Sequence, residues 1–367
     1  MSKPVFAFAC ALLVLVAGCS TTPRPRDPSK PLPANWDADL GPQHELEPDV
    51  ALPARPQPPP TNIVQKAPAP LTSAESGMVS LNRWAAQNGL RELRTVALPP
   101  APSYAVVTPQ GSFAVQIGRL TAFWDGLEVR LGFPPQQIGN QIFLNALDIR
   151  KILEPLAHGL AVATSANRLV VIDPGHGGSN TGARNVVAGR YEKDYTLDWA
   201  KRLVPLLEQN GWRVALTRTN DIFLSRAERV EFADAHRASL FISLHFNTTG
   251  DGNPGPAGLE TYCVTPAGMP SSLTRGYTDD VRVIFPNNAF DGENLRYAVR
   301  LHRSLLQVNG HNDRGIRHAR FLDVLVGQQR PAVLIEGGYL SNPAEAKLVA
   351  DAAYRQKLAE AVAKALE

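Results

Sequence analysis

The stretch VVIDPGHGGSNTGA, Val170 to Ala183, decides the fold: a run of β-branched residues leads into an Asp-Pro pair, four glycines and one histidine. A short continuous apolar run is typical of a buried strand, and the glycines that follow indicate a tight turn. In open α/β sheets, ligand sites lie at the carboxyl ends of the strands. By itself the stretch is compatible with a phosphate cradle, a metal site or a simple turn.

The glycine spacing excludes the two common phosphate-binding motifs. Gly177 and Gly182 have the separation of a P-loop, but Ala183 stands where that motif requires lysine. The dinucleotide fingerprint also fails, because no third glycine follows Gly175 and Gly177 at the required position. What remains is a histidine on a glycine-rich turn at the end of a strand.

From residue 167 to the C-terminus, predicted strands and helices alternate. This alternation predicts an α/β domain with a mostly parallel sheet covered by helices. The expected strands are 168–173 (RLVVID), 212–217 (WRVALT), 239–246 (SLFISLHF), 258–264 (GLETYCV), 320–325 (RFLDVL) and 332–336 (AVLIE). The expected helices are 194–211, 224–237, 293–310 and the tail from residue 343.

The N-terminus predicts an exported lipoprotein. Residues 1–18 combine Lys3, a short apolar run and small residues, as in a signal peptide, and they end at Cys19 in VAGC, which resembles the bacterial lipobox. An ordinary signal with an incidental cysteine is the alternative. Ser20 after the cysteine fits an outer-membrane destination, so we expect a lipid anchor at Cys19 that holds the protein in the cell envelope, facing the periplasm. Only Cys263 then remains in the folded part, so no internal disulfide can form.

Two further regions precede the α/β domain. Residues 19–75 are rich in proline and poor in aliphatic residues, which predicts a disordered, extended tether. Residues 76–160 predict a small α+β domain, in which residues 104–117 (YAVVTPQGSFAVQI) show the alternation of a β-hairpin. This region has no cysteine and no histidine before His158, so we expect it to act as a spacer or binding module.

Two histidines stand at the ends of predicted strands. His176 follows the first strand and His245 closes the third, so both can reach the same edge of a parallel sheet and converge on one ion. Neutral imidazole is a preferred zinc ligand. Glu192, in the first turn of the intervening helix, is either a third ligand or a charge favoured by the helix dipole.

A second carboxylate, Glu336, closes the strand PAVLIEGG. A charge there is costly unless it is paired or functional, and the two glycines that follow would let a ligand approach the backbone. Two histidines and one glutamate around zinc leave a coordination position open for water, as in hydrolytic sites. Because a further carboxylate can accept a proton from that water and pass it to a leaving amine, the set predicts amide or peptide hydrolysis.

In this order, the residues resemble one family. The segments that carry the resemblance run from about residue 169 to the C-terminus: VVIDPGHGGSNTGA, EKDYTLDWAKRL, VALTRTNDIFLSRAERVEFAD, SLFISLHFN, GLETYCV, DRGIRHARFLDVL and PAVLIEGGYLSNPAEAKLV. They are similar to the zinc-dependent N-acetylmuramoyl-L-alanine amidases of the amidase 3 type, which cleave peptidoglycan between the lactyl group of MurNAc and the L-Ala of the stem peptide.

The resemblance implies a mixed, mostly parallel twisted sheet of about six strands flanked by helices. It also implies that His176, Glu192 and His245 bind one zinc ion. Glu336 would be the catalytic acid/base.

Several other residues fall in the resembling segments. Arg218, with Asp221 and Arg229, either contacts substrate or belongs to a structural ion-pair cluster that fixes a turn. Asn247, two residues after a proposed ligand, is either a substrate or ligand-supporting contact or a turn-forming residue. Arg226 stands where the family usually has an aliphatic residue.

The largest departure from the family is the segment 265–294, which is longer than the connection in minimal members. In some relatives an insertion here forms a helix that plugs the zinc site. Because this version is rich in Pro, Gly and Asn, we expect instead a packing or substrate-lining loop that shapes the glycan groove.

The sequence therefore predicts a lipid-anchored zinc amidase that acts on peptidoglycan during cell-wall remodelling or division. The alternatives are another zinc peptidase, such as a carboxypeptidase that cuts within the stem, and a non-catalytic peptidoglycan-binding lipoprotein. The net charge is only +3 and no Lys/Arg block exceeds two residues, so nucleic acid is not an expected partner. Whether a protein activator is required stays open.

Overall fold

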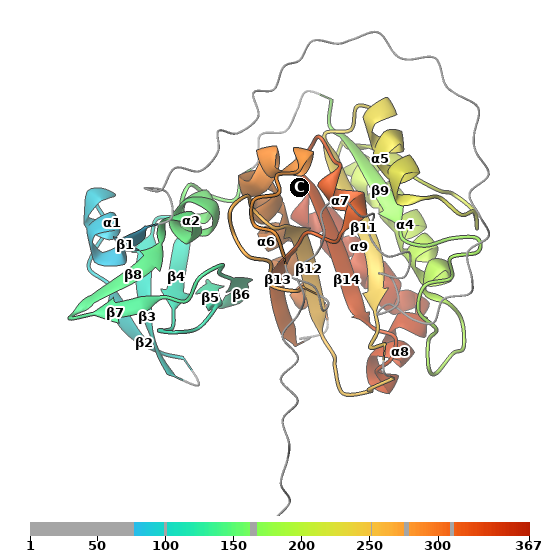
Figure 1. The fold of residues 1–367 in the computed structure, drawn as a ribbon. Helices are drawn as coiled ribbons and strands as arrows, with labels where there is room; N and C mark the ends of the chain where they lie inside the picture. Colours follow the sequence, from blue (N-terminus) through green and yellow to red (C-terminus); the bar gives the residue numbers. More distant parts are fainter. Residues whose placement is uncertain (1–76, 99–100, 162–166, 251, 275–278, 309–311) are drawn as a thin grey trace, which may run out of the picture.

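The computed structural model describes residues 77–98, 101–161, 167–250, 252–274, 279–308 and 312–367 (Figure 1). The expected signal peptide, the lipidation site Cys19 and the proline-rich tether all lie outside these residues, so they stay predictions. In the described ranges, no helix combines the length and the apolar character that crossing a membrane requires.

The C-terminal half contributes six neighbouring strands to a sheet with the order β10-β9-β11-β14-β12-β13. The strands are β9 (Leu169–Pro174), β10 (Arg213–Leu216), β11 (Leu240–Asn247), β12 (Leu259–Val264), β13 (Asp313–Ala319) and β14 (Ala332–Tyr339). All neighbouring pairs are parallel except β12 and β14, which run antiparallel. The mixed, mostly parallel α/β sheet that the sequence predicts is confirmed.

Helices cover both faces of these strands. They are α4 (Glu192–Gln209), α5 (Arg226–Ala235), α6 (Asp291–Leu306), α7 (Asp323–Val326), α8 (Pro343–Ala350) and α9 (Ala352–Ala365), with a 3-10 turn η4 (Pro286–Phe290) before α6. Successive strand residues point to opposite faces. Val170 and Ile172 accordingly pack into the core under α4, α6 and α9, whereas Val171 packs into the core on the side of α5 and α7.

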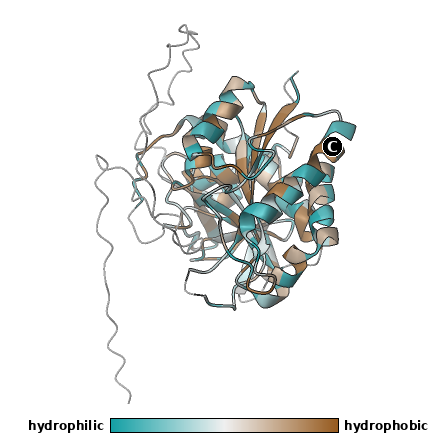
Figure 2. Cartoon of the chain, turned by 90° about the vertical axis from the view of Figure 1, so that its right-hand side faces the viewer, coloured by the Kyte–Doolittle hydropathy of each residue, from teal (hydrophilic) through white to brown (hydrophobic). Residues whose placement is uncertain are grey.

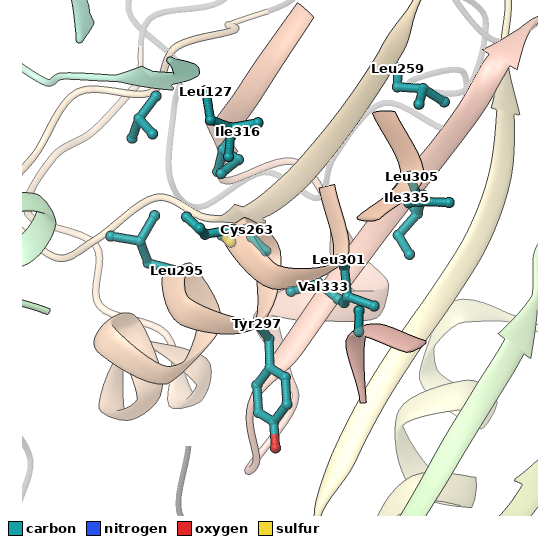
Figure 3. Close-up of a cluster of buried hydrophobic side chains, with 14 of the residues drawn as sticks. Leu127, Leu259, Cys263, Leu295, Tyr297, Leu301, Leu305, Ile316, Val333 and Ile335 are labelled. Carbon is teal, nitrogen blue, oxygen red and sulfur yellow. The ribbon is translucent and has the colours of Figure 1, made fainter. Parts of the chain in front are cut away.

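Apolar side chains fill the space between the helices and the sheet. Figure 3 shows Leu301 and Leu305 of α6 close to Val333 and Ile335 of β14, and all four are buried in one cluster. Figure 2 shows hydrophobic residues concentrated in the central strands and hydrophilic stretches on the outer helices. Burial of such side chains contributes roughly 1.5–3 kcal/mol each, and it fixes the strand ends that carry the site.

One predicted strand is wrong. The strand in this part of the chain is β13, which ends at Ala319, and the segment 320–325 leaves the sheet and enters the short helix α7. Its apolar residues Phe321 and Leu325 are buried, but they pack on the sheet from a turn and a helix. A short apolar run does not distinguish a strand from another buried segment, because both expose little surface to water.

The N-terminal described part, from residue 77 to residue 161, contains two sets of strands. Its elements are β1 (Met78–Ser80), α1 (Leu81–Gln87), β2 (Arg94–Leu98), β3 (Ala101–Thr108), β4 (Gly111–Val115), β5 (Thr121–Trp124), β6 (Leu127–Arg130), β7 (Gln136–Ile138), β8 (Gln141–Asn145), α2 (Ala146–Asp148), a π-helical turn η3 (Ile149–Leu153) and α3 (Glu154–Ala157). Strands β2 to β6 form an antiparallel meander, and β1, β8 and β7 form a separate sheet. The expected hairpin is the pair β3 and β4.

The meander joins the C-terminal sheet, which the sequence does not predict. Strand β6 pairs in parallel with β13 through Val129 and Ile316, so the eleven strands form one sheet. The Glu128 amide donates to Asp313 Oδ2 at 2.9 Å beside this pairing. The small N-terminal part is thus docked on an edge strand of the C-terminal half (Figure 1).

Candidate metal centre

Three predicted ligands meet at the carboxyl ends of the parallel strands. His176 lies on the turn after β9, His245 lies near the end of β11, and Glu192 is the first residue of α4. Their ligand atoms all lie within 4.8 Å of one another. The centroids of the two imidazole rings lie 4.9 Å apart, and the ring planes are nearly perpendicular.

The Glu192 carboxylate joins the two histidines. Its Oε2 lies 3.1 Å from His176 Nε2 and accepts a hydrogen bond from the Ala183 amide at 3.0 Å. Its Oε1 lies 3.1 Å from His245 Nδ1 and accepts a hydrogen bond from the Phe246 amide at 3.0 Å. Burial alone would raise the pKa of Glu192, but the two histidines outweigh burial and hold this pKa below its ordinary value. The centre therefore contains a buried carboxylate anion.

The ring of His176 is oriented by Asn180. The Oδ1 atom of Asn180 lies 2.7 Å from His176 Nδ1, and it also accepts a hydrogen bond from the Gly182 amide. Because this amide oxygen accepts, Nδ1 carries a proton, and Nε2 is the ring nitrogen that faces Glu192. His176 also has a φ of 62°, which few residues other than glycine adopt. Sequence reasoning missed Asn180, since nothing in its spacing distinguishes it from an ordinary turn residue.

Two glycines allow the turn to close on the ligands. A Cβ atom on Gly182 would lie 2.6 Å from Glu192 Oε2, and one on Gly175 would lie 2.3 Å from the ring of His245. Real Cβ atoms do not approach other atoms this closely, so both positions require glycine. Two imidazoles and a carboxylate are also a donor set that zinc accepts. The residues present therefore fit the metal that the sequence predicts.

A buried ion pair between Asp173 and Arg229 supports the turn that carries His176. Asp173 Oδ1 accepts hydrogen bonds from Arg229 Nη1 at 2.5 Å and from Thr217 Oγ1 at 2.6 Å, and its Oδ2 accepts from Ser243 Oγ at 2.7 Å. Arg229 Nη2 donates to the main-chain oxygen of His176 at 2.9 Å. Burial would raise the pKa of Asp173, but Arg229 and the two hydroxyls hold it below its ordinary value. Sequence reasoning missed Asp173, and Arg229 has the structural role that was one of its two alternatives.

Arg218 is also engaged with the turn. Its guanidinium donates to the main-chain oxygens of Pro174 at 2.9 Å, of Gly175 at 2.8 Å and of Lys193 at 2.8 Å. The side chain is buried, and burial together with the charge of Arg229 lowers the pKa of Arg218 to about 10. The arrangement favours a structural role for Arg218 over the predicted substrate contact, because its donors already serve the backbone.

Glu336 lies beside the metal cluster through strand register. On β14 it is paired with His245 of β11 on one side and with Glu260 of β12 on the other. Neighbouring strands lie about 4.8 Å apart, and paired residues point to the same face. The carboxyl group of Glu336 is buried on the face that carries His245. Sequence reasoning missed Glu260, although a glutamate inside the apolar strand GLETYCV is the same signal that identifies Glu336.

The two glycines after Glu336 have a different role from the one predicted. A Cβ on Gly337 would lie 2.9 Å from the rings of Phe246 and Trp199. A Cβ on Gly338 would lie 3.4 Å from the carboxylate of Glu345. Gly337 therefore makes room for aromatic side chains, whereas Gly338, at a φ of 130°, has a backbone conformation that favours glycine.

A pocket of about 300 Å³ is lined in part by Glu260, the strand neighbour of Glu336. Its wall includes Asn247, whose Nδ2 donates to Glu260 Oε2 at 2.8 Å. Leu273, from the segment 265–294, contributes to another wall. Among the residues that the structure describes, this segment adds no ligand to the three-residue metal cluster. The placement agrees with a lining loop, and a substrate contact by Asn247 stays a prediction.

Comparisons with known proteins point to one family. Residues 170–367 match the family model described as N-acetylmuramoyl-L-alanine amidase. The chain is 32% identical over 223 residues to the N-acetylmuramoyl-L-alanine amidase AmiA of Salmonella typhimurium, and the matched region covers 54% of this chain and 75% of that protein. It is also 32% identical over 226 residues to AmiA of Escherichia coli, and the matched region covers 55% of this chain and 76% of that protein. Among solved structures, the N-acetylmuramoyl-L-alanine amidase AmiC2 of Nostoc punctiforme is 33% identical, with a TM-score of 0.45 and coverage of 55% of this chain and 97% of that chain.

Proposed function

This chain belongs to the N-acetylmuramoyl-L-alanine amidase family and is a peptidoglycan amidase, and we propose that it uses one zinc ion to cleave the bond between the lactyl group of MurNAc and the L-Ala of the stem peptide. One observation carries the zinc proposal: the buried carboxylate of Glu192 is shared between His176 and His245, with Glu336 in register with His245. We further propose that the enzyme works in cell-wall remodelling or division.

Two of the proposed ligands have supporting contacts with the rest of the protein. Two backbone amides fix the carboxylate of Glu192, and Asn180 fixes the ring of His176. Such supporting contacts preserve ligand geometry and reduce the cost of binding a metal. A zinc ion bound by these three side chains would supply a Lewis acid that polarises the scissile carbonyl and makes water more acidic.

Glu336 would perform the proton transfers. Its carboxylate accepts a proton as water attacks the lactyl carbonyl, so that the new C–O bond forms without releasing a free proton. It then donates that proton to the nitrogen of L-Ala as the C–N bond breaks. Its burial on the strand next to His245 keeps the carboxylate beside the reacting bond and away from bulk water.

We propose that Cys19 anchors the enzyme by lipid to the envelope, facing the periplasm, and that residues 19–75 act as its tether. The proposal rests on the VAGC sequence and on the proline content. A tether of this kind would let a membrane-anchored catalytic domain reach the peptidoglycan polymer.

Mass spectrometry of the products from purified peptidoglycan tests the reaction. The wild-type protein is expected to release intact stem peptides that begin with L-Ala. Shortened stems that remain attached to glycan would instead identify a carboxypeptidase, and binding without any product would identify a non-catalytic lipoprotein.

A Glu336→Gln variant tests the proposed acid/base. It is expected to keep its zinc and to lose hydrolysis, because the amide cannot accept the proton. Wild-type turnover by this variant would remove Glu336 from the mechanism.

A further inference from the structure

Two arginines line the pocket that Glu260 borders, and each donates a hydrogen bond through Nε. Arg314 Nε donates to Glu260 Oε1 at 2.9 Å, and the guanidinium lies 5.1 Å from the centre of the Tyr339 ring. Arg317 Nε donates to the main-chain oxygen of Arg314 at 2.9 Å and lies 3.6 Å from Glu260 Oε1. Within the described part of the chain, neither arginine uses its Nη atoms in a hydrogen bond to protein.

The nearby carboxylate of Glu260 does not occupy these Nη donors. Glu260 is buried, and its Oε2 already accepts from Asn247 Nδ2 at 2.8 Å and from the Tyr262 hydroxyl at 2.9 Å. Its Oε1 faces the Nε atoms of the two arginines. The arginine side chains remain 32% and 17% exposed, so their outer nitrogens can reach a bound molecule.

The chemistry of this wall is that of a carboxylate site. A guanidinium presents two parallel N–H donors that match the two oxygens of a carboxylate. The aromatic face of Tyr339 under Arg314 limits the orientation of that guanidinium. Together, two arginines held through Nε, whose Nη donors make no hydrogen bond to the described residues, would form a pre-arranged anion site in the pocket of about 300 Å³.

The position of the pocket selects which carboxylate it would bind. Glu260 is paired with Glu336 on the adjacent strand, about 5 Å away, and Arg314 Nε lies a further 2.9 Å from Glu260 Oε1, so the arginine side chains lie roughly 8 Å from the proposed acid/base. One residue of extended peptide spans about 3.5 Å. A group about two residues from the scissile bond would therefore reach the arginines.

We propose that Arg314 and Arg317 bind the free α-carboxylate of the second stem residue, D-isoglutamate, and so make the enzyme selective for stems in which this group is not amidated. The proposal rests on the proposed amidase function, because it places the scissile bond at Glu336. Arg314 and Arg317 thus act as specificity determinants, and they take no part in proton transfer.

A matched pair of substrates tests this selectivity: two MurNAc-tripeptides with L-Lys at the third position, which differ only in D-isoglutamate or D-isoglutamine at the second. The wild-type protein is expected to show a kcat/KM roughly 10-fold higher for the carboxylate substrate, the scale of a lost charge-assisted hydrogen bond. In Arg314→Gln and in Arg317→Gln the ratio of the two kcat/KM values is expected to fall toward one. Arg317→Lys keeps the positive charge but loses the paired N–H donors of the guanidinium, so it is expected to retain part of the preference for the carboxylate substrate.

The ratio also separates recognition from damage to the fold, since a merely structural defect lowers both kcat/KM values together. Arg303→Gln is the control, because Arg303 is a partly exposed arginine paired with Asp125 away from the pocket, and its ratio is expected to equal that of the wild type. Equal cleavage of both substrates by the wild type, or an unchanged ratio in both Gln variants, would overturn the proposal. If the wild type cleaves neither substrate, the proposed function itself fails, and this inference fails with it.

Discussion

The ion pair between Asp173 and Arg229 gives a quantitative prediction about how the turn that carries His176 is held. Arg229→Met removes a 2.5 Å charged hydrogen bond from a buried carboxylate and leaves the main-chain oxygens of Pro174 and His176 without this donor. Removing one partner of a buried ion pair costs about 3–5 kcal/mol. The hydroxyls that still donate to Asp173 keep the expected loss near the lower limit, about 3 kcal/mol of the free energy of unfolding.

Urea unfolding followed by circular dichroism at about pH 7 measures this loss, with a chelator present so that bound metal does not contribute. Arg226→Met is the matched control on the same helix: this arginine is partly exposed and lies 3.7 Å from Asp323. A pair of this kind contributes about 1 kcal/mol or less. The double variant Arg229→Met with Asp173→Asn removes both charges of this pair, so it is expected to lose less stability than the two single losses added together.

The loss also depends on pH in a defined direction. In the wild type the pKa of Asp173 is lowered, so its stabilising contribution is present above the unfolded pKa of about 3.9 and is lost as the pH falls through the lower folded value. Without Arg229, burial dominates and raises the pKa of Asp173, so the variant is penalised at neutral pH and relieved as the carboxylate protonates. The stability difference between the wild type and Arg229→Met is therefore expected to narrow between about pH 7 and about pH 4. A loss no larger than that of Arg226→Met, or one independent of pH, would refute this reasoning.

Three other substitutions, one of them with a matched control, separate the metal centre from the core. Gly182→Ala and its control Gly89→Ala both place alanine at a positive φ, of 64° and 67°, but only Gly182→Ala puts a Cβ against Glu192. Zinc affinity, measured by competition with a chelator, is expected to fall at least 10-fold in Gly182→Ala and to stay unchanged in Gly89→Ala. Equal zinc affinities in the two variants would contradict the close-contact argument. Asn180→Ala is expected to weaken zinc binding roughly 10- to 100-fold in the same assay, because the ring of His176 loses its orienting acceptor, and unchanged affinity would show that the contact is dispensable. Gly337→Ala is expected to lower the melting temperature without changing zinc affinity, because its Cβ would meet buried aromatic rings, and a loss of zinc with an unchanged melting temperature would reverse that assignment.

The part of the site that the sequence predicts is the part set by local pattern. His176, His245 and Glu336 each follow an apolar run, and polar residues at the ends of parallel strands must meet at one edge of the sheet. The residues that were missed act over long distances in the sequence. Asp173 meets Arg229 from 56 residues away, and no spacing rule connects a strand residue with one particular turn of a later helix.

The same distinction applies to the fold. Five of the six strands of the C-terminal half are indicated by apolar runs and by their alternation with helices, whereas β13 (DRGIRHA) has no such run. The pairing of β6 with β13 depends on one register contact between Val129 and Ile316, nearly two hundred residues apart. Edge strands carry no sequence mark of the partner they will choose. The strand predicted at 320–325 is wrong for a related reason. The residues there are apolar because they are buried, and burial alone does not show whether a segment pairs with a neighbouring strand.

The central claim is that His176, Glu192 and His245 hold one zinc ion that amide hydrolysis requires. The most direct measurement is a titration of chelator-stripped protein with zinc, in which bound metal and the release of stem peptides from peptidoglycan are followed in the same samples. The account predicts that both signals rise together and level off at one zinc per chain, and that His245→Ala shows neither at these concentrations. Full hydrolysis by metal-free protein, or hydrolysis by His245→Ala at the wild-type rate, would contradict it.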